Sequence, residues 1–245
     1  MYRFFVDRDQ ISDGKAVITG EDAHHIKNVL RMKKGENVYL SCGDEWEYEC
    51  IIDDFSDDRV ILSVADASKP GKELPCRITL YQCLPKKDKM ELIIQKAVEL
   101  GVYDIVPVES SRCIVRIDPK KRASRVERWN SIAKAAAKQS KRLIEPKVHE
   151  PVRFGDAVKE ASEKSISFIP YERAEGMDDT RRLFSSIKNK DTVGIMIGPE
   201  GGFDESEIET AIKSNIRPIT LGKRILRTET AGMAALSMLT YVLED

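Results

Sequence analysis

Two loops near the carboxyl end of the chain carry the residues best suited to chemistry. The first, 198–202, reads Gly-Pro-Glu-Gly-Gly. Its glycines let backbone N–H and C=O groups approach a flat ligand closely. The second, 221–231, offers backbone access at Gly222 and a charged pair, Arg227 with Glu229. An apolar slot beside that pair would be formed by Leu221, Ile225 and Leu226.

Each loop is expected to follow a strand and to precede a helix. The run 192–197 is apolar and of strand length, and Asp204 with Glu207 has the spacing of a capping box that opens a helix. A second strand is expected at 216–221 and a helix rich in small residues at 228–243. Two such units place both loops at the carboxyl ends of neighbouring strands, where open α/β sheets bind ligands.

The usual nucleotide motifs are missing from the sequence. Neither Gly-x-Gly-x-x-Gly nor Gly-x-x-x-x-Gly-Lys-Ser/Thr occurs. The sequence therefore lacks the phosphate-binding loop that a doubly wound nucleotide-using enzyme would contain. The loop 198–202 alone fits a structural turn as well as it fits a ligand loop. Two such loops in series favour a binding site.

Composition excludes several classes of protein. Hydrophobic residues make up 41% and charged residues 33% of the 245 residues, as in a soluble globular protein. There is no apolar run of about 18 residues and no signal-peptide pattern, so we expect a cytoplasmic location. Five cysteines without a Cys-x-x-Cys pair predict reduced, buried thiols, and three histidines without metal-binding spacing predict no metal site.

Charge is distributed unevenly along the chain. The formal net charge is −1, yet residues 111–147 hold twelve Lys or Arg and three acids, a local charge of +9. Such separation indicates an anionic partner. The segment 44–58, with eight acids and no base, is interpreted as a solvated hairpin edge.

We expect two parts, 1–72 and 73–245, joined by a linker at 68–72. The first is predicted to be a small β-rich unit with one helix at 21–31 and strands at 3–6, 37–41, 47–52 and 60–64. In the second, strands at 77–84, 104–108 and 167–170 and a short extended piece at 147–149 alternate with helices. The helices are expected at 87–100, 120–143, 156–161 and 181–187. This alternation predicts an α/β fold with a mostly parallel sheet covered on both faces.

The amino-acid sequences of both loops resemble those of a known family. Ile-Gly-Pro-Glu-Gly-Gly-Phe at 197–203 and Leu-Gly-Lys-Arg-Ile-Leu-Arg-Thr-Glu-Thr-Ala at 221–231 are similar to the RsmE family of 16S ribosomal RNA uridine-N3 methyltransferases, which belongs to the SPOUT class. Further matching segments lie at 24–31, 96–102, 128–129, 136–142 and 170–172. The resemblance therefore covers nearly the whole chain in order.

This resemblance implies a PUA-like RNA-binding barrel at 1–72 and a SPOUT methyltransferase domain at 73–245 with a deep trefoil knot, a feature that general rules would reject. It also implies a homodimer. Small residues of the last helix would pack either within one subunit or across the dimer: Ala231, Gly232, Ala234, Ala235 and Ser237.

The family binds S-adenosylmethionine among three loops, which correspond here to 170–172, 198–202 and 221–228. The cofactor-binding residues implied by the resemblance are Pro170, Tyr171, Ile197, Gly198, Pro199, Glu200, Gly201, Gly202, Leu221, Gly222, Ile225, Leu226, Arg227 and Thr228.

The implied reaction methylates uracil N3 of a specific uridine near the decoding centre of the small ribosomal subunit. The N3 proton must leave, and the anion that results must be stabilised. We assign anion stabilisation to Arg227, and to Glu229 the role of its orienting partner or of the base. Glu200 competes for the base role, and a purely structural Arg227–Glu229 ion pair is the alternative.

Ten basic residues and one glutamine are the candidate contacts to 16S RNA or to the assembled small subunit. They are Arg3, Lys27, Arg31, Arg112, Arg116, Arg125, Arg128, Lys138, Gln139, Lys141 and Arg142. Gln139 and Arg142, one helical turn apart, are alternatively placed to reach the target base. Lys138 departs from the family pattern, which commonly has Glu there. Trp129 is expected in the core rather than as a stacking platform.

Two other functions are consistent with the same residues. The chain could be a SPOUT methyltransferase that acts on another RNA position, such as a ribose 2′-OH or transfer RNA. It could also be a non-catalytic RNA-binding factor of ribosome assembly.

Overall fold

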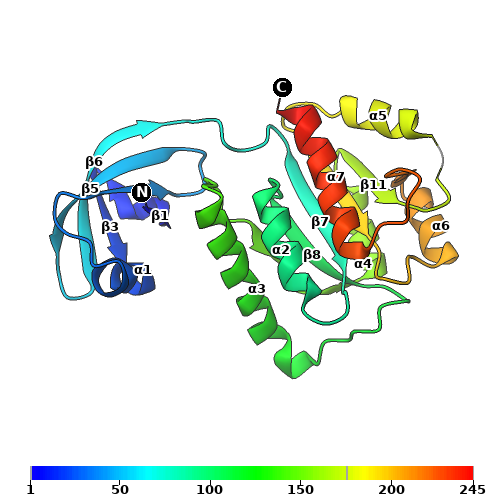
Figure 1. Ribbon diagram of the computed structural model, residues 1–245, viewed down its shortest axis with the longest axis horizontal. Coiled ribbons are helices and arrows are strands. Elements are labelled where there is room, and N and C mark those ends of the chain that lie inside the picture. Colours follow the sequence, from blue (N-terminus) through cyan, green and yellow to red (C-terminus); the bar gives the residue numbers. More distant parts are fainter. Residues whose placement is uncertain (1, 175, 245) are drawn as a thin grey trace. The chain divides into compact units, whose positions relative to one another are not determined.

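The computed structural model describes residues 2–174 and 176–244. The chain divides into two compact units. The first consists of the residues up to 73 together with 137–145, and the second of 74–136 together with 146 onwards (Figure 1). The first unit thus includes a short segment that follows much of the second in sequence.

A curled six-stranded sheet forms the first unit, with strand order β1-β4-β5-β6-β3-β2. Its strands pair antiparallel except for β1 and β4, which are parallel. This confirms the expected β-rich unit and adds the hairpin of β2 and β3, which was not predicted. The strands are β1 (Tyr2–Phe5), β2 (Ile11–Ser12), β3 (Lys15–Thr19), β4 (Asn37–Ser41), β5 (Glu47–Phe55) and β6 (Arg59–Ser68).

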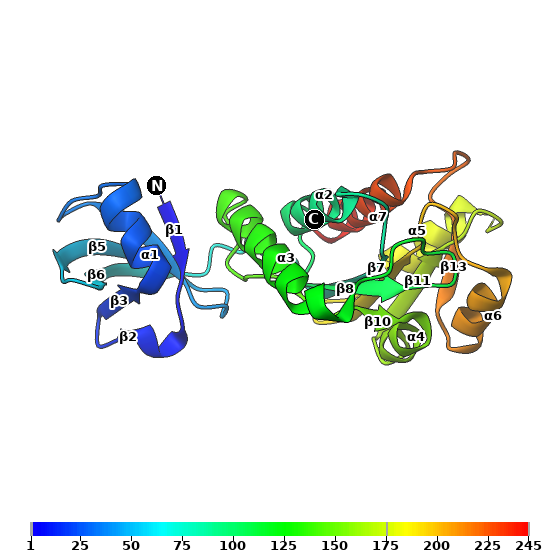
Figure 2. The same cartoon turned by 90° about the horizontal axis from the view of Figure 1, so that it is seen from below.

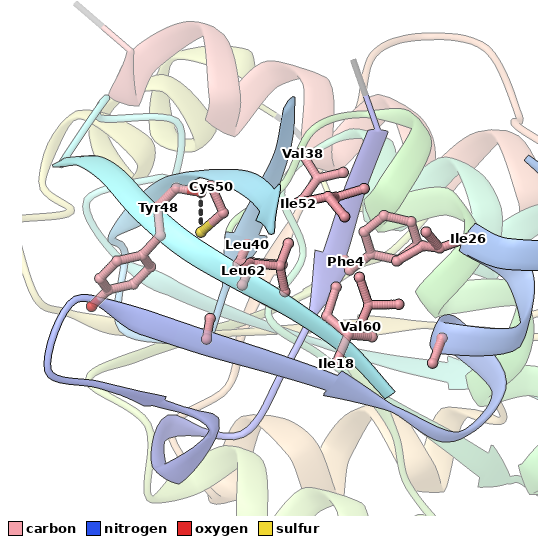
Figure 3. Close-up of a cluster of buried hydrophobic side chains, with 12 residues drawn as sticks. Phe4, Ile18, Ile26, Val38, Leu40, Tyr48, Cys50, Ile52, Val60 and Leu62 are labelled. Carbon is pink, nitrogen blue, oxygen red and sulfur yellow. Dashed lines mark hydrogen bonds between the residues drawn. The ribbon is translucent and has the colours of Figure 1, made fainter. Parts of the chain in front are cut away.

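The core of this unit lies on the inner side of the sheet. Alternate residues of each strand point inward, as the two-residue period of a strand requires. On β4 these are Val38 and Leu40, and on β6 Val60 and Leu62, all fully buried (Figure 3). Phe4 of β1 packs into the same cluster.

One helical segment covers this core. A short turn of 3-10 helix, η1 (Arg8–Gln10), precedes it in sequence. The segment begins as α1 (Gly20–His24) and continues as a π-helical turn, η2 (His25–Val29). The predicted helix at 21–31 was therefore too long at its end, because Arg31 has a left-handed φ of +53° that a helix does not allow.

All recorded strand pairs of the second unit are parallel, which confirms the predicted sheet type. The order is β10-β8-β7-β12-β11-β13, and β9 also pairs with β8. The strands are β7 (Arg77–Cys83), β8 (Asp104–Glu109), β9 (Lys147–Val148), β10 (Val152–Arg153), β11 (Ile166–Pro170), β12 (Thr192–Ile197) and β13 (Arg217–Ile219).

Helices cover both faces of this sheet, as predicted. In Figure 2, α2 and α7 lie side by side on one face, and α4 and α6 lie on the other. The helices are α2 (Lys89–Glu99), α3 (Pro119–Gln139), α4 (Phe154–Ser162), α5 (Met177–Ser185), α6 (Glu205–Lys213) and α7 (Thr228–Leu243). The predicted helix to 143 was too long, since α3 ends at Gln139 and Lys141 has a left-handed φ of +60°.

The order of three strands decides where the loops meet. We expected β12 and β13 to be neighbours, but β11 lies between them. Pro170 pairs with Ile219, and the register of β11 with β12, continued to the strand end, sets Ile197 level with Pro170. The loops after all three strands therefore start at the same edge of the sheet. The trefoil knot stays a prediction.

Within the described ranges, no helix is both long and apolar enough to cross a membrane.

Gly194, in the middle of β12, provides a test of this packing. A Cβ there would lie 2.3 Å from Ser167 Oγ on β11, so Gly194→Ala should destabilise the unit by about 1–3 kcal/mol through overpacking. Gly155→Ala is the matched control, because a Cβ on this α4 residue meets nothing within 4 Å. Urea denaturation followed by circular dichroism should show a lower midpoint for the first variant only. Equal midpoints would contradict the packing described.

Candidate functional site

The three loops at the edge of the sheet surround one cavity of about 640 Å³, within the size range of small-molecule sites. All fourteen residues that the sequence assigned to a cofactor line it. They come from the end of β11, the end of β12 with its loop, and the loop before α7: Pro170, Tyr171, Ile197, Gly198, Pro199, Glu200, Gly201, Gly202, Leu221, Gly222, Ile225, Leu226, Arg227 and Thr228.

Glycine gives two of the loops their shape. Gly202 and Gly222 have φ values of +67° and +117°, which side chains rarely allow. A Cβ on Gly198 would lie 3.2 Å from the ring of Phe203. Backbone groups therefore form much of the wall, and Ile225, 87% exposed, adds an apolar side chain at the cavity.

A buried hydroxyl joins the first loop to the last helix. Thr228 begins α7, and its Oγ1 donates to the carbonyl oxygen of Gly198 at 2.6 Å. The Oγ1 of Thr228 in turn accepts a hydrogen bond from Nε2 of Gln82 at 2.9 Å. Gln82 pairs with Ile197 in the sheet, so this relay connects β7, the loop after β12 and α7. Thr228 lines the cavity and at the same time holds its wall.

The charged groups pair differently from our expectation. Glu229 does not pair with Arg227; its Oε2 lies 3.2 Å from Nζ of Lys89, a residue that the sequence analysis did not single out. Lys89 also lies 3.2 Å from Oε1 of Glu200. Arg227 is exposed and has no ion pair with any described residue. Its guanidinium is therefore available to a ligand.

The two carboxylates differ in position. Glu200 lines the cavity, and its Oε1 also accepts the backbone N–H of Lys86 at 3.0 Å. Glu229 is absent from the lining residues, and its Oε2 is buried without a hydrogen bond from the described residues. Glu229 can thus act on a ligand only through Lys89, whose side chain does line the cavity.

Hydrogen bonds keep these groups charged. Burial alone would raise the pKa of Glu200, but hydrogen bonds from the backbone and from Lys89 hold that pKa below its ordinary value. The nearby carboxylate of Glu229, 3.2 Å from Nζ, is the largest cause that raises the pKa of Lys89. Glu200 is therefore an ionised carboxylate at neutral pH, and Lys89 remains a cation.

Arg112, a predicted RNA contact, braces the first loop. Its Nη1 donates to the carbonyl oxygen of Gly201 at 3.1 Å, and its Nη2 pairs with Asp204 at 3.1 Å. Asp204 and Glu207 form the predicted capping box of α6. Arg112 thus connects the cavity wall to the start of that helix.

Two other predicted RNA contacts line a second hollow, of about 280 Å³, beside the first turns of α2 and α3. Arg125 and Arg128 line it together with Lys87 and Lys121. Arg128 pairs with Glu91 at 2.8 Å, whereas no ion pair is recorded for Arg125 within the described chain. Arg116 lies outside this hollow and donates to the carbonyl oxygen of Ser110 at 3.3 Å.

Arg3 and Arg142 were wrong as RNA contacts, because both are buried. Arg3 is 7% exposed, donates to Ser41 Oγ at 2.7 Å and pairs with Glu47. Arg142 is 5% exposed, and its guanidinium lies 2.6 Å from Glu73. Acidic partners in the same unit compensate both charges.

The remaining candidate RNA contacts of the first unit divide into anchored and exposed side chains. Lys138 pairs with Asp22 at 2.7 Å and lies over the ring of Phe4, and Lys27 donates to the carbonyl oxygen of Asp57 at 3.0 Å. Three candidates stay exposed: Arg31, Gln139 and Lys141.

Three further expectations can be compared with the structure. All five cysteines are free, and Trp129 is 4% exposed, as predicted. Among the described residues, no group of three His, Cys, Asp or Glu side chains could hold a metal ion.

Comparison with known proteins places this geometry in a family. Residues 72–240 match a model described as an RNA methyltransferase domain, and residues 18–65 match one described as an RNA methyltransferase PUA domain. Ribosomal RNA small subunit methyltransferase E of Bacillus subtilis is 35% identical over all of this chain and 98% of the relative. The chain belongs to the ribosomal RNA small subunit methyltransferase E family.

Solved structures support this assignment to the methyltransferase E family. Such an enzyme from Neisseria gonorrhoeae, bound to S-adenosylmethionine, is 31% identical with a TM-score of 0.85 over 99% of this chain and 98% of that one. A methyltransferase of Legionella pneumophila, also with bound S-adenosylmethionine, is 32% identical with a TM-score of 0.84 over 98% and 97%.

Two residues of this methyltransferase E site went unnoticed in the sequence, Lys89 and Gln82. Lys89 is one of several lysines at the start of an amphipathic helix, and Gln82 is the polar residue in an otherwise apolar strand end. A polar residue at a position expected to be buried was the one available signal, and it pointed to Gln82 alone.

Thr228→Val tests the buried relay. Valine keeps the shape but leaves the carbonyl of Gly198 without its donor, so stability should fall by about 1–3 kcal/mol. Thr230→Val on the exposed side of α7 is the control and should change stability little. Thermal unfolding of both variants measures the difference. A Thr228→Val protein as stable as the wild type would show that the hydroxyl of Thr228 does not stabilise the fold.

Proposed function

We propose that this protein methylates N3 of a specific uridine in 16S ribosomal RNA, near the decoding centre of the small subunit, with S-adenosylmethionine as the donor. One observation carries the proposal: three loops of a chain in the methyltransferase E family enclose a single cavity of about 640 Å³. Relatives with the same fold bind S-adenosylmethionine.

The cavity suits this donor. Glycine backbone at 198–202 can approach a flat adenine ring, and Leu221, Ile225 and Leu226 offer apolar contact. When bound, S-adenosylmethionine supplies a methyl group activated by its sulfonium. The residues of the chain must then align the nucleophile and make the lone pair of N3 available.

Arg227 is the proposed stabiliser of the uracil anion. It lines the cavity, is exposed and lacks an ion pair with the described residues, so its guanidinium can reach O2 or O4 of the base. A base that leaves its stack can enter such a site, as other base-modifying enzymes require.

Glu200 is the stronger candidate for the proton acceptor, since it lines the cavity and Glu229 does not. Its pKa is held low, so it is ionised but weakly basic. Proton removal from N3 would then depend on how well Arg227 stabilises the anion. Glu229 takes an orienting role, toward Lys89 rather than toward Arg227.

The RNA backbone is proposed to contact two basic surfaces. One is the hollow at the start of α2 and α3, with Lys87, Lys121, Arg125 and Arg128. The other lies in the first unit, where Arg31, Gln139 and Lys141 are exposed. Opposite charge draws phosphates to both surfaces.

The proposed homodimer would use the outer side of α7. Gly232 and Ala235 are buried within the subunit, and a Cβ on Gly232 would approach Ile197 at 3.8 Å. Ser237 and Tyr241 face outward, and Tyr241 is 82% exposed. Gly232 and Ala235 thus serve internal packing, and Ser237 and Tyr241 lie on the surface that a second copy would cover. The trefoil knot and a cytoplasmic location belong to the same proposal.

The reaction is tested directly with purified protein, S-adenosylmethionine and either free 16S RNA or small subunits that lack the modification. Mass spectrometry of the digested nucleosides should detect 3-methyluridine. A 2′-O-methylated nucleoside would instead identify a SPOUT enzyme with another target. Donor binding without any methylated product would favour the non-catalytic assembly factor.

Arg227→Ala should lower the single-turnover methylation rate by about 10²–10³-fold, as the loss of an anion-stabilising donor does elsewhere. The dissociation constant for the donor should change little. Arg217→Ala, on an exposed residue at the start of β13, is the control. A normal rate for Arg227→Ala would remove this residue from the mechanism.

Arg125→Ala should weaken RNA binding and reduce the slope of log affinity against log salt by about 1, since one phosphate contact is lost. Binding of fluorescently labelled 16S RNA, measured by anisotropy at several salt concentrations, gives the slope. Lys213→Ala, an exposed lysine of α6, should leave the slope unchanged. An unchanged slope for Arg125→Ala would exclude the α2–α3 hollow from the RNA footprint.

A further inference from the structure

Lys89 occupies an unusual position for a lysine. It is the first residue of α2, where the positive end of the helix dipole disfavours a cation. A lysine at that position needs compensation from nearby negative charge. Two carboxylates supply it, Glu200 and Glu229, each 3.2 Å from Nζ.

These carboxylates belong to two different segments that border the cavity. Glu200 belongs to the loop after β12, and Glu229 to the first turn of α7. The backbone N–H of Lys86 adds a third bond, to Glu200 at 3.0 Å. Three segments that are distant in sequence are therefore joined at one ammonium group.

Without the ammonium, two negative charges would remain close together. Oε2 of Glu229 is already buried without a hydrogen bond from the described residues, so Lys89 is its main compensation. Repulsion between the carboxylates would push the loop away from α7. The relay from Thr228 to the carbonyl of Gly198 joins the same two segments and would be strained with them.

We propose that Lys89 is a positioning residue that holds the loop 198–202 against α7 through Glu200 and Glu229, and so keeps the cavity in the shape that binds the methyl donor. The inference rests on the proposed function, because S-adenosylmethionine is taken as the ligand. Lys89 acts through the two carboxylates.

Two ligands separate positioning from simple attraction of charge. S-adenosylmethionine carries a sulfonium cation, whereas S-adenosylhomocysteine lacks it. Removal of Lys89 makes the site more negative, so charge attraction alone would tighten binding of the sulfonium ligand. Loss of loop position instead weakens both ligands to a similar extent.

Isothermal titration calorimetry of the full-length chain measures both dissociation constants. Lys89→Met should raise each about tenfold, which corresponds to about 1.4 kcal/mol of binding free energy. Lys89→Arg should stay within about threefold of the wild type, because arginine keeps the charge. Lys96→Met is the matched control, as this lysine of the same helix pairs only with Glu99 in the recorded ion pairs and should bind normally.

A second variant isolates the repulsion. Lys89→Met combined with Glu229→Gln removes one of the two facing charges, so its dissociation constants should fall back toward the wild-type values. Such non-additivity is expected only when the residues act together. The double variant also serves if the Lys89→Met protein unfolds. In that case the thermal unfolding temperature of the double variant shows whether removing one carboxylate charge restores the fold.

Three outcomes decide the matter. Weaker binding of both ligands with recovery in the double variant supports the positioning role. Unchanged binding by a folded Lys89→Met protein, or weaker binding with no recovery, overturns it. If the wild-type protein itself binds neither ligand, the proposed function fails, and the inference that rests on it fails as well.

Discussion

The pairing of β11 between β12 and β13 is the constraint on which the site depends. Pro170 lies opposite Ile219, and the register with β12 brings Ile197 to the same level. Three loops that are far apart in sequence therefore begin at one edge of a parallel sheet, the edge where such sheets bind ligands. A shift of one residue in either pairing would turn buried side chains to the opposite face and separate the loops.

Polar contacts then hold the loops in place. A neutral relay runs from Gln82 through Thr228 to Gly198, and a charged one joins Glu200 and Glu229 through Lys89. The neutral relay is buried, so its hydrogen bonds are hard to exchange with water. With these charges engaged, Arg227 is left exposed at the cavity, which suits a residue that must meet a substrate.

The sequence predicted those features that depend on residues close together along the chain. Asp204 and Glu207 form their capping box because both partners lie within one helical turn. The cavity-lining residues were predicted from the resemblance of the loop sequences to those of the RsmE family. Lys89 could not be found this way, since its partners lie more than a hundred residues away and meet it only in the folded chain. Arg3 and Arg142 were misjudged for the same reason: a cation looks exposed until Glu47 or Glu73 is known to lie beside it.

Primer extension on 16S RNA tests the central claim most directly, because a methyl group on uracil N3 blocks the Watson–Crick edge and stops reverse transcriptase. RNA from the parent strain should show a stop next to one uridine near the decoding centre, and RNA from a strain without this protein should show none. Return of the wild-type gene should restore the stop. A stop that persists in the absence of the protein would contradict the account.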